Sequence, residues 1–215
     1  MKKGCIFDLD GTLVNSLMDL ACSVNRVLEK HGLEPHELQA YNQFVGNGVK
    51  KLIERALGAE HQDLFDECLE EFHEDYEEHC LDHTRPYEGM YETLCKLHQQ
   101  GVQLAVVTNK PHNLAIKIVE TLFPEMFTSI LGQQDLYPVK PSPQSTIITL
   151  ATMKLSKEDC FFIGDSDVDI HTADEVEMDS IGVSWGFRGR QELEMAGATF
   201  VCDKPEEIEE LVNSK

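Results

Sequence analysis

The chain has 215 residues and a formal net charge of −21, with 41% hydrophobic and 27% charged residues. This is the composition of a folded globular protein, and so acidic a surface repels nucleic acid and anionic membranes, so we expect neither as a partner. Apolar runs fall short of the roughly 20 residues that a membrane helix needs. The seven cysteines are scattered without a CxxC pair, which favours reduced thiols and a cytoplasmic location.

The first predicted element is a short buried strand at residues 4–7, which ends abruptly in an acidic turn. Similar apolar runs follow at residues 104–107, 160–163, 180–183 and 199–202, each separated from the next by helical patterns. Buried strands that alternate with helices indicate an α/β fold with a doubly wound parallel sheet covered on both faces.

Residues 16–82 have a different pattern. Apolar residues recur at helical spacing, as in Leu20, Val24 and Leu28, and no strand pattern interrupts them. We therefore expect an all-helical cap at 16–82, inserted into a catalytic core made of residues 1–15 and 83–215.

Asp8 and Asp10 directly follow the first predicted strand. Two carboxylates two residues apart can face the same side, and ligands of open α/β sheets bind beyond the carboxyl ends of the strands. One aspartate can then act as a nucleophile while the other serves as acid and base. Taken alone, the pattern fits a polar turn after a strand equally well.

Further polar groups follow the later strands. The hydroxyl of Thr108 and the amide groups around Asn109 suit a phosphate oxygen, although both residues are also ordinary helix caps. Lys140 precedes a proline, which keeps it out of a helix and lets its ammonium neutralise a carboxylate and a phosphoryl oxygen. Read singly, Thr108 and Lys140 fit a helix cap and a solvated surface lysine better.

Asp165 and Asp169 belong to an acidic cluster after the predicted strand 160–163. Clustered carboxylates at a strand end suit a hard cation such as Mg²⁺. A nucleophile, a hydroxyl, a lysine and metal carboxylates thus arrive in chain order, each at or beyond a strand end. Phosphoryl transfer needs this combination, with an in-line nucleophile, a metal and fixed cations.

The sequence resembles the haloacid dehalogenase-like superfamily of phosphohydrolases, most closely its phosphoglycolate phosphatase group. The resemblance covers essentially the whole chain, and its carriers are residues 7–13, 106–110, 140–143 and 164–169. It implies hydrolysis of a small phosphate monoester through an aspartyl-phosphate on Asp8, with Asp10 as acid and base.

The same resemblance assigns the other site residues. Thr108 and Asn109 would hold the phosphoryl group, and Lys140 would bridge the nucleophile and the phosphate. Mg²⁺ would be bound by the carboxylates of Asp8 and Asp165 and by the backbone carbonyl of Asp10. Asp169 would be a supporting carboxylate of the metal site.

Two residues depart from the family pattern outside the catalytic positions. Asn15 replaces a usual aspartate, and Glu177 replaces a glycine that usually ends the helix after the fourth motif. If the backbone at Glu177 is left-handed, its side chain lowers stability.

The substrate should be a small phosphorylated metabolite, bound by a monomer or weak dimer. Residues 45–51 of the cap are the best candidate for recognising the substrate, because two glycines allow an unusual backbone path close to a ligand. Asn47 offers donors and acceptors, and Lys50 or Lys51 could meet a substrate carboxylate. Equally, these glycines could join two helices and leave the lysines in solvent.

Three alternatives share some of these features. An inorganic pyrophosphatase or a phosphomutase of the same superfamily would carry the same four motifs. A non-enzymatic phospho-acceptor combines an aspartate, a hydroxyl and a lysine, but Asp10 and the inserted cap argue against it.

Overall fold

A computed structural model describes all 215 residues, and its centre is a sheet of six parallel strands in the order β5-β4-β1-β6-β7-β8. All five predicted strands are present, while β5 was not predicted. It lies at the sheet edge, and its sequence Ser-Ile-Leu-Gly-Gln holds only two consecutive apolar residues. The strands are β1 (Gly4–Phe7), β4 (Gln103–Pro111), β5 (Ser129–Gln133), β6 (Cys160–Gly164), β7 (Ser180–Val183) and β8 (Phe200–Cys202).

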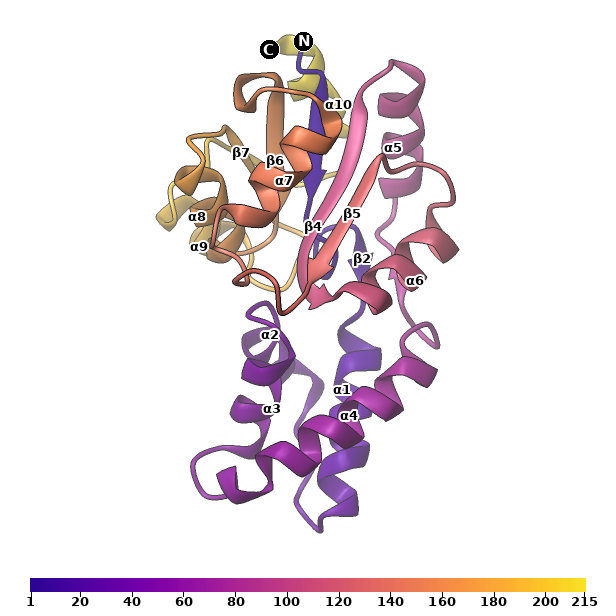
Figure 1. The fold of residues 1–215 in the computed structure, drawn as a ribbon, viewed down its shortest axis with the longest axis vertical. Helices are drawn as coiled ribbons and strands as arrows, with labels where there is room; N and C mark the ends of the chain where they lie inside the picture. Colours follow the sequence, from indigo (N-terminus) through magenta and orange to yellow (C-terminus); the bar gives the residue numbers. More distant parts are fainter.

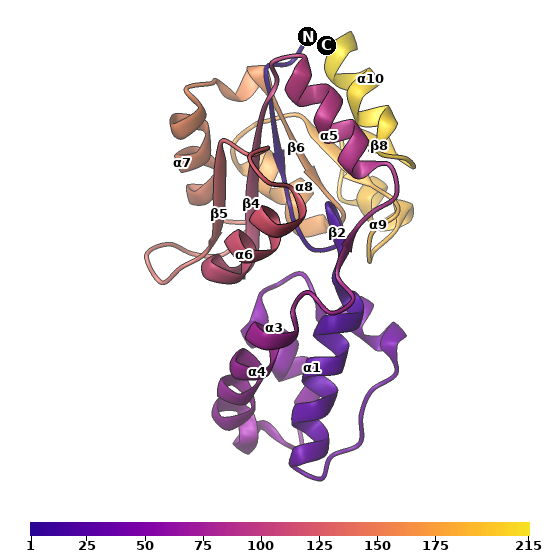
Figure 2. The same cartoon turned by 90° about the vertical axis from the view of Figure 1, so that its right-hand side faces the viewer.

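Helices cover both faces of the sheet, as Figure 2 shows for α5 and α10 on one side and α7 on the other. Strand β1 explains why, because its side chains alternate between two apolar clusters. Phe7 packs with the helices α5 (Met90–Gln99), α6 (His112–Leu122) and α10 (Glu206–Ser214). Ile6 packs on the opposite face with α7 (Gln144–Met153) and α8 (Asp167–Glu175). The doubly wound fold is therefore confirmed.

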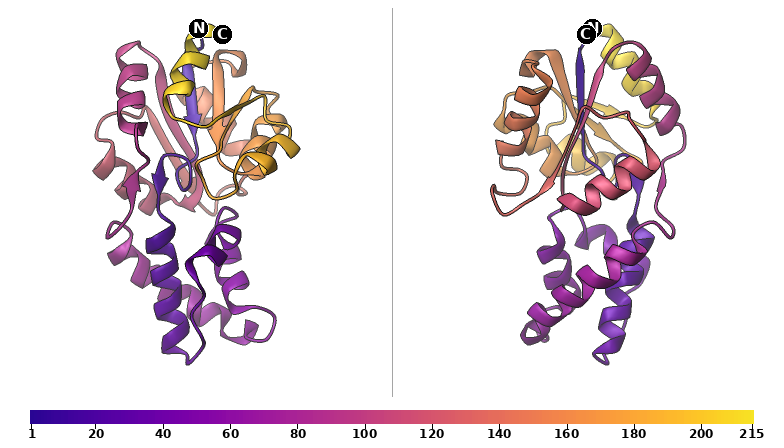
Figure 3. Two further views of the ribbon diagram at one scale, coloured as in Figure 1. Left: turned by 180° about the vertical axis from the view of Figure 1, so that it is seen from behind. Right: turned by 45° about the vertical axis from the view of Figure 1, so that its right-hand side comes forward.

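Four helices form a separate group beyond the carboxyl ends of the strands (Figure 1). They are α1 (Leu17–Lys30), α2 (Tyr41–Phe44), α3 (Val49–Leu57) and α4 (Phe65–His79), and we call this group the cap. No strand occurs between residues 16 and 82. Figure 3 shows the cap from two further sides, at the opposite end of the molecule from both termini.

Two short strands join the cap to the core. β2 (Val14–Asn15) pairs antiparallel with β3 (Arg85–Pro86), so the outgoing and returning chains run side by side. This ribbon lies next to the predicted boundaries, and the limits 1–15, 16–82 and 83–215 remain a prediction.

A buried carboxylate on α1 secures the returning chain. Asp19 accepts hydrogen bonds from the backbone nitrogens of His83 (2.9 Å) and Thr84 (2.8 Å) and from the Thr84 hydroxyl (2.7 Å). Burial acts to raise the pKa of Asp19, but the hydrogen bonds from Thr84 and His83 outweigh it and hold the pKa below its ordinary value. The anionic carboxylate is therefore the form that the fold stabilises.

Two peripheral features complete the fold. The helix α9 (Arg190–Met195) lies beside β7 and β8. Glu177 has a φ of 53°, so the left-handed backbone that a glycine would favour is present and carries a glutamate instead. None of the helices combines the length and the apolar character needed to cross a membrane.

Candidate active site

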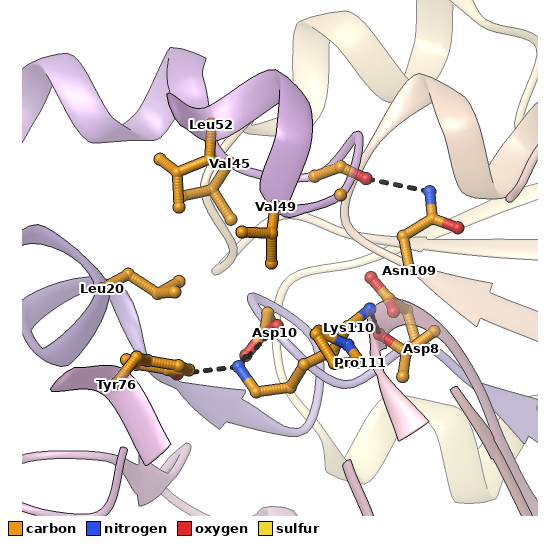
Figure 4. Close-up of a pocket in the computed structure, with 13 residues that line it drawn as sticks. Asp8, Asp10, Leu20, Val45, Val49, Leu52, Tyr76, Asn109, Lys110 and Pro111 are labelled. Carbon is orange, nitrogen blue, oxygen red and sulfur yellow. Dashed lines mark hydrogen bonds and ion pairs between the residues drawn. The ribbon is translucent and has the colours of Figure 1, made fainter. Parts of the chain in front are cut away.

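The candidate site lies where the strand order reverses. The chain passes from β1 to β4 and β5 on one side, and then continues with β6, β7 and β8 on the other. Such a switch point leaves a crevice beyond the carboxyl ends of the strands. Asp8 follows β1 there, between Thr108 of β4 and Asp165 after β6. Asp8, Asp10 and Thr108 border a cavity of about 450 Å³ of empty space, including its open mouth (Figure 4).

Three carboxylates and one lysine are buried together at this switch point. Asp8, Asp165 and Asp169 each place an oxygen within 4.8 Å of the other two, and none is more than 7% exposed. The Lys140 ammonium lies 2.9 Å from Asp8 Oδ1 and 2.6 Å from Asp169 Oδ1. The structure thus brings together four residues that the sequence placed in three separate motifs.

Two glycines make room for Asp165. A Cβ atom at Gly11, where φ is 85°, would lie 2.3 Å from Asp165 Oδ2, and one at Gly186 would lie 2.2 Å from Asp165 Cβ. Either contact would displace the carboxylate. Its Oδ2 also accepts a hydrogen bond of 2.7 Å from the backbone nitrogen of Phe187. The Asp165 side chain is therefore held between the turn after β1 and the loop after β7.

This cluster contains three carboxylates and only one ammonium group. Burial raises the pKa of Asp8 to about 6, with Lys140 opposing and Asp169 adding to the rise. Burial, Asp169 and Asp8 together raise the pKa of Asp165 well above its usual range. A bound divalent cation would offset this mutual repulsion, and the hard carboxylate oxygens are ligands that Mg²⁺ prefers. The donor set therefore fits Mg²⁺.

Asp169 already has partners for both of its oxygens. Oδ1 accepts from Lys140, while Oδ2 accepts from the backbone nitrogen (3.1 Å) and hydroxyl (2.8 Å) of Ser166 at the start of α8. This reciprocal cap fixes the carboxylate. The contacts make Asp169 a residue that positions Lys140, and its support of a metal remains a prediction.

Asp10 has a partner that the sequence had not singled out. The Lys110 ammonium donates to Asp10 Oδ1 (2.9 Å) and Oδ2 (3.1 Å), and to the hydroxyl of Tyr76 in cap helix α4 (2.7 Å). Ser16 Oγ adds a hydrogen bond of 2.6 Å to Asp10 Oδ1. Burial would lower the pKa of Lys110, but Asp10 and Tyr76 raise it above its ordinary value, so the amine stays protonated.

A sequence signal for Lys110 did exist. Thr108 and Lys110 are two residues apart in strand β4, and alternate residues of a strand point to the same side. A lysine in that register with Thr108 should face the same cavity, and both residues do line it. Tyr76 carried no such signal, because its place depends on how the cap meets the core.

Asn109 joins three segments instead of leaving its amide free. Its Oδ1 accepts from the backbone nitrogen of Lys140 (2.7 Å), and its Nδ2 donates to the carbonyl oxygens of Lys140 (3.2 Å) and Gly46 (3.2 Å). Figure 4 shows the hydrogen bond from Asn109 to the carbonyl oxygen of Gly46 in the cap loop. A role of this side chain in holding phosphate remains a prediction.

The structure does not bring Asn47 or Lys50 into the cavity. Asn47 Oδ1 accepts a hydrogen bond of 2.8 Å from Arg55 within the cap, and Lys50 is exposed. Lys51 is exposed as well and pairs with Glu54 at 2.6 Å. The cap instead lines the cavity with Gly46 and Gly48 of the same loop, together with apolar side chains and Tyr76.

A family model described as haloacid dehalogenase-like hydrolase matches residues 5–183. The chain belongs to this family. The matched region contains nearly all of β1, the whole cap, and Asp8, Lys110 and Asp165. Membership in this hydrolase family agrees with the resemblance found in the sequence.

Individual relatives agree over nearly the full length. Phosphoglycolate phosphatase from Pseudomonas putida is 32% identical over 206 residues, covering 92% of this chain and 75% of that one. The phosphoglycolate phosphatase of Psychrobacter arcticus is 31% identical, with 94% and 92% covered. Among solved structures, a predicted phosphoglycolate phosphatase from Haemophilus somnus has a TM-score of 0.91 and 30% identity, covering 98% of this chain and 97% of that chain.

Proposed function

We propose that this hydrolase cleaves small phosphate monoesters by transferring the phosphoryl group to Asp8 and then to water. The carrying observation is the pair Asp8 and Asp10 at one cavity, with Lys140 paired to the first and Lys110 to the second. A nucleophile and an acid–base group need different surroundings: Asp8 lies in the buried cluster with Asp165 and Asp169, whereas Asp10 lies outside that cluster and accepts from Ser16.

In the first step, an oxygen of Asp8 attacks phosphorus, a new O–P bond forms, and the bond to the leaving oxygen breaks. Asp10 donates a proton to that leaving oxygen. In the second step, water attacks the acyl phosphate while Asp10 accepts a proton from it, which restores both aspartates. The net products are an alcohol and inorganic phosphate.

Fixed donors stabilise the charge that moves during both steps. Lys140 stays between Asp8 and Asp169, so its ammonium faces the attacking oxygen without rearrangement. The Thr108 hydroxyl accepts a long hydrogen bond of 3.3 Å from the backbone nitrogen of Lys110. The hydroxyl proton of Thr108 is therefore free to bond a phosphoryl oxygen.

The metal in this proposal is Mg²⁺, held by the carboxylates of Asp8 and Asp165 and by the backbone carbonyl of Asp10. When bound, it supplies positive charge that offsets the charge on the phosphoryl oxygens. Asp169 orients Lys140, and Gly11 and Gly186 keep the space around Asp165 that its carboxylate needs.

For the substrate we propose 2-phosphoglycolate or a close analogue, on the strength of the relatives that act on it by name. The cavity is small, and cap loop 46–48 lies against the core through Asn109. Pyrophosphate hydrolysis and phosphomutase activity remain rivals, since they would use the same core. Comparing turnover of 2-phosphoglycolate, pyrophosphate and a sugar phosphate in Mg²⁺ separates the three.

The central test is Asp8→Asn, with the exposed Asp174→Asn on helix α8 as the matched control. Loss of a covalent nucleophile should reduce turnover by about four orders of magnitude or more, while the control stays near wild type. Circular dichroism should show that both variants are folded. If folded Asp8→Asn keeps more than about a tenth of the wild-type rate, Asp8 is not the nucleophile.

A further inference from the structure

Lys110 is the one cationic side chain that lines the cavity. The other charged residues along it are Asp8 and Asp10, and the cap wall is apolar, made largely of Leu20, Val45, Val49 and Leu52 (Figure 4). An apolar wall offers no partner to a polar group of the substrate. Lys110 is therefore the only lining side chain whose positive charge can offset an anionic group beyond the phosphate.

The ammonium of Lys110 lies on the cap side of the cavity. It is 2.7 Å from the Tyr76 hydroxyl and 4.6 Å from the centre of the Tyr76 ring, and the Lys110 side chain is only 2% exposed. A phosphoryl group attacked by Asp8 lies at the core side, and its leaving oxygen faces Asp10. Because Lys110 Nζ is 2.9 Å from Asp10 Oδ1, it lies beside the leaving group.

We propose that Lys110 binds a carboxylate, or a similar anionic group, on the leaving portion of the substrate, and so selects acidic phosphate esters over neutral ones. This inference rests on the proposed phosphatase function. Lys110 also offsets the repulsion between that carboxylate and Asp10. Tyr76 orients the ammonium and is a positioning residue, since its hydroxyl fixes Nζ between core and cap.

A simpler role for Lys110 is to hold Asp10 in place, and the two roles predict different results. If Lys110 only positions Asp10, its loss slows every substrate by the same factor and leaves affinity for unreactive ligands unchanged. If Lys110 reads the carboxylate, its loss weakens the binding of acidic ligands selectively.

The experiment measures binding of two unreactive phosphonates by calorimetry in the presence of Mg²⁺. 3-Phosphonopropionate has the shape and charge of 2-phosphoglycolate, and propylphosphonate lacks its carboxylate. The wild type should bind 3-phosphonopropionate at least about tenfold more tightly than propylphosphonate. Lys110→Gln, which retains hydrogen-bond donors, and Lys110→Met should each remove most of this preference and leave propylphosphonate within about threefold.

The control variant is Lys96→Met on α5, an exposed lysine paired with Glu209, which should keep the wild-type preference. The inference fails if the wild type does not distinguish the two phosphonates. It also fails if either folded Lys110 variant retains the preference or loses affinity for both ligands equally. Hydrolysis assays with 2-phosphoglycolate and ethyl phosphate report separately on the proposed function, because phosphonate binding needs no turnover.

Discussion

Replacing Asp19 by alanine should loosen the junction between cap and core. The Asp19 side chain is 1% exposed, and it contacts four groups of His83 and Thr84: both backbone nitrogens, the Thr84 hydroxyl and the His83 ring nitrogen Nδ1. Alanine removes the carboxylate acceptor, and its methyl group cannot accept these hydrogen bonds. Because Thr84 is fully buried, its backbone nitrogen and hydroxyl would be left without partners.

The expected loss follows from those two donors. A buried donor without a partner costs about 1–3 kcal/mol, so Asp19→Ala should lower the free energy of unfolding by about 2–5 kcal/mol. The His83 donor adds little, because the His83 side chain is 61% exposed and water can reach this part of the chain. For a chain of this size, the melting temperature should fall by roughly 5–15 °C.

Urea and thermal unfolding, followed by circular dichroism at pH 7, measure this loss. Asp75→Ala is the control, because Asp75 forms a more exposed ion pair with Arg26 and should cost about 1 kcal/mol or less. The reasoning is refuted if Asp19→Ala is no more destabilising than Asp75→Ala. Since the folded pKa of Asp19 is lowered, its contribution exists above the unfolded value of about 3.9 and is lost as pH falls through the folded value. The difference in the free energy of unfolding between wild type and Asp19→Asn should therefore decrease as the pH falls.

Three further outcomes are expected. Asp10→Asn should slow phosphorylation of Asp8 by about 10²–10⁴-fold in rapid-quench experiments, and a normal rate would exclude the acid role. Exhaustive EDTA treatment should abolish turnover, with recovery in Mg²⁺ and inhibition by Ca²⁺, which takes more ligands at longer distances; full activity after EDTA would exclude the metal. Glu177→Gly should raise the melting temperature by about 2–4 °C by relieving the left-handed backbone, and an unchanged or lower value would show that the ion pair with Lys157 matters more.

The sequence predicted those strands that contain an unbroken run of apolar residues. All four residues of β1 are buried, as are all five of β6, so each appears as an unbroken apolar run. β5 escaped prediction because its sequence holds only two consecutive apolar residues, Ile130 and Leu131, whereas the other edge strand, β8, keeps the run Phe200–Cys202. β2 and β3 escaped it because two residues each are too few to show a period.

The candidate site divides in the same way. Asp8, Lys140 and Asp165 could be predicted to meet, because parallel strands end at one edge of the sheet and each residue follows such an end. The link from Lys110 to Tyr76 could not, since it joins residues 34 positions apart through the docking of a helical cap. Residue spacing in a strand or helix carries no information about that docking.

The segment at the end of β4, residues 108–110, both lines the cavity and contacts the cap, and the sequence predicted only the first of these roles. Thr108 lines the cavity, Asn109 links the Lys140 loop to Gly46 of the cap, and Lys110 links Asp10 to Tyr76 of the cap. Displacing the cap must therefore break the contacts that Asn109 and Lys110 make with Gly46 and Tyr76. The position of the cap and the position of the Asp10 carboxylate are therefore linked, because Lys110 contacts both Asp10 and Tyr76 of the cap.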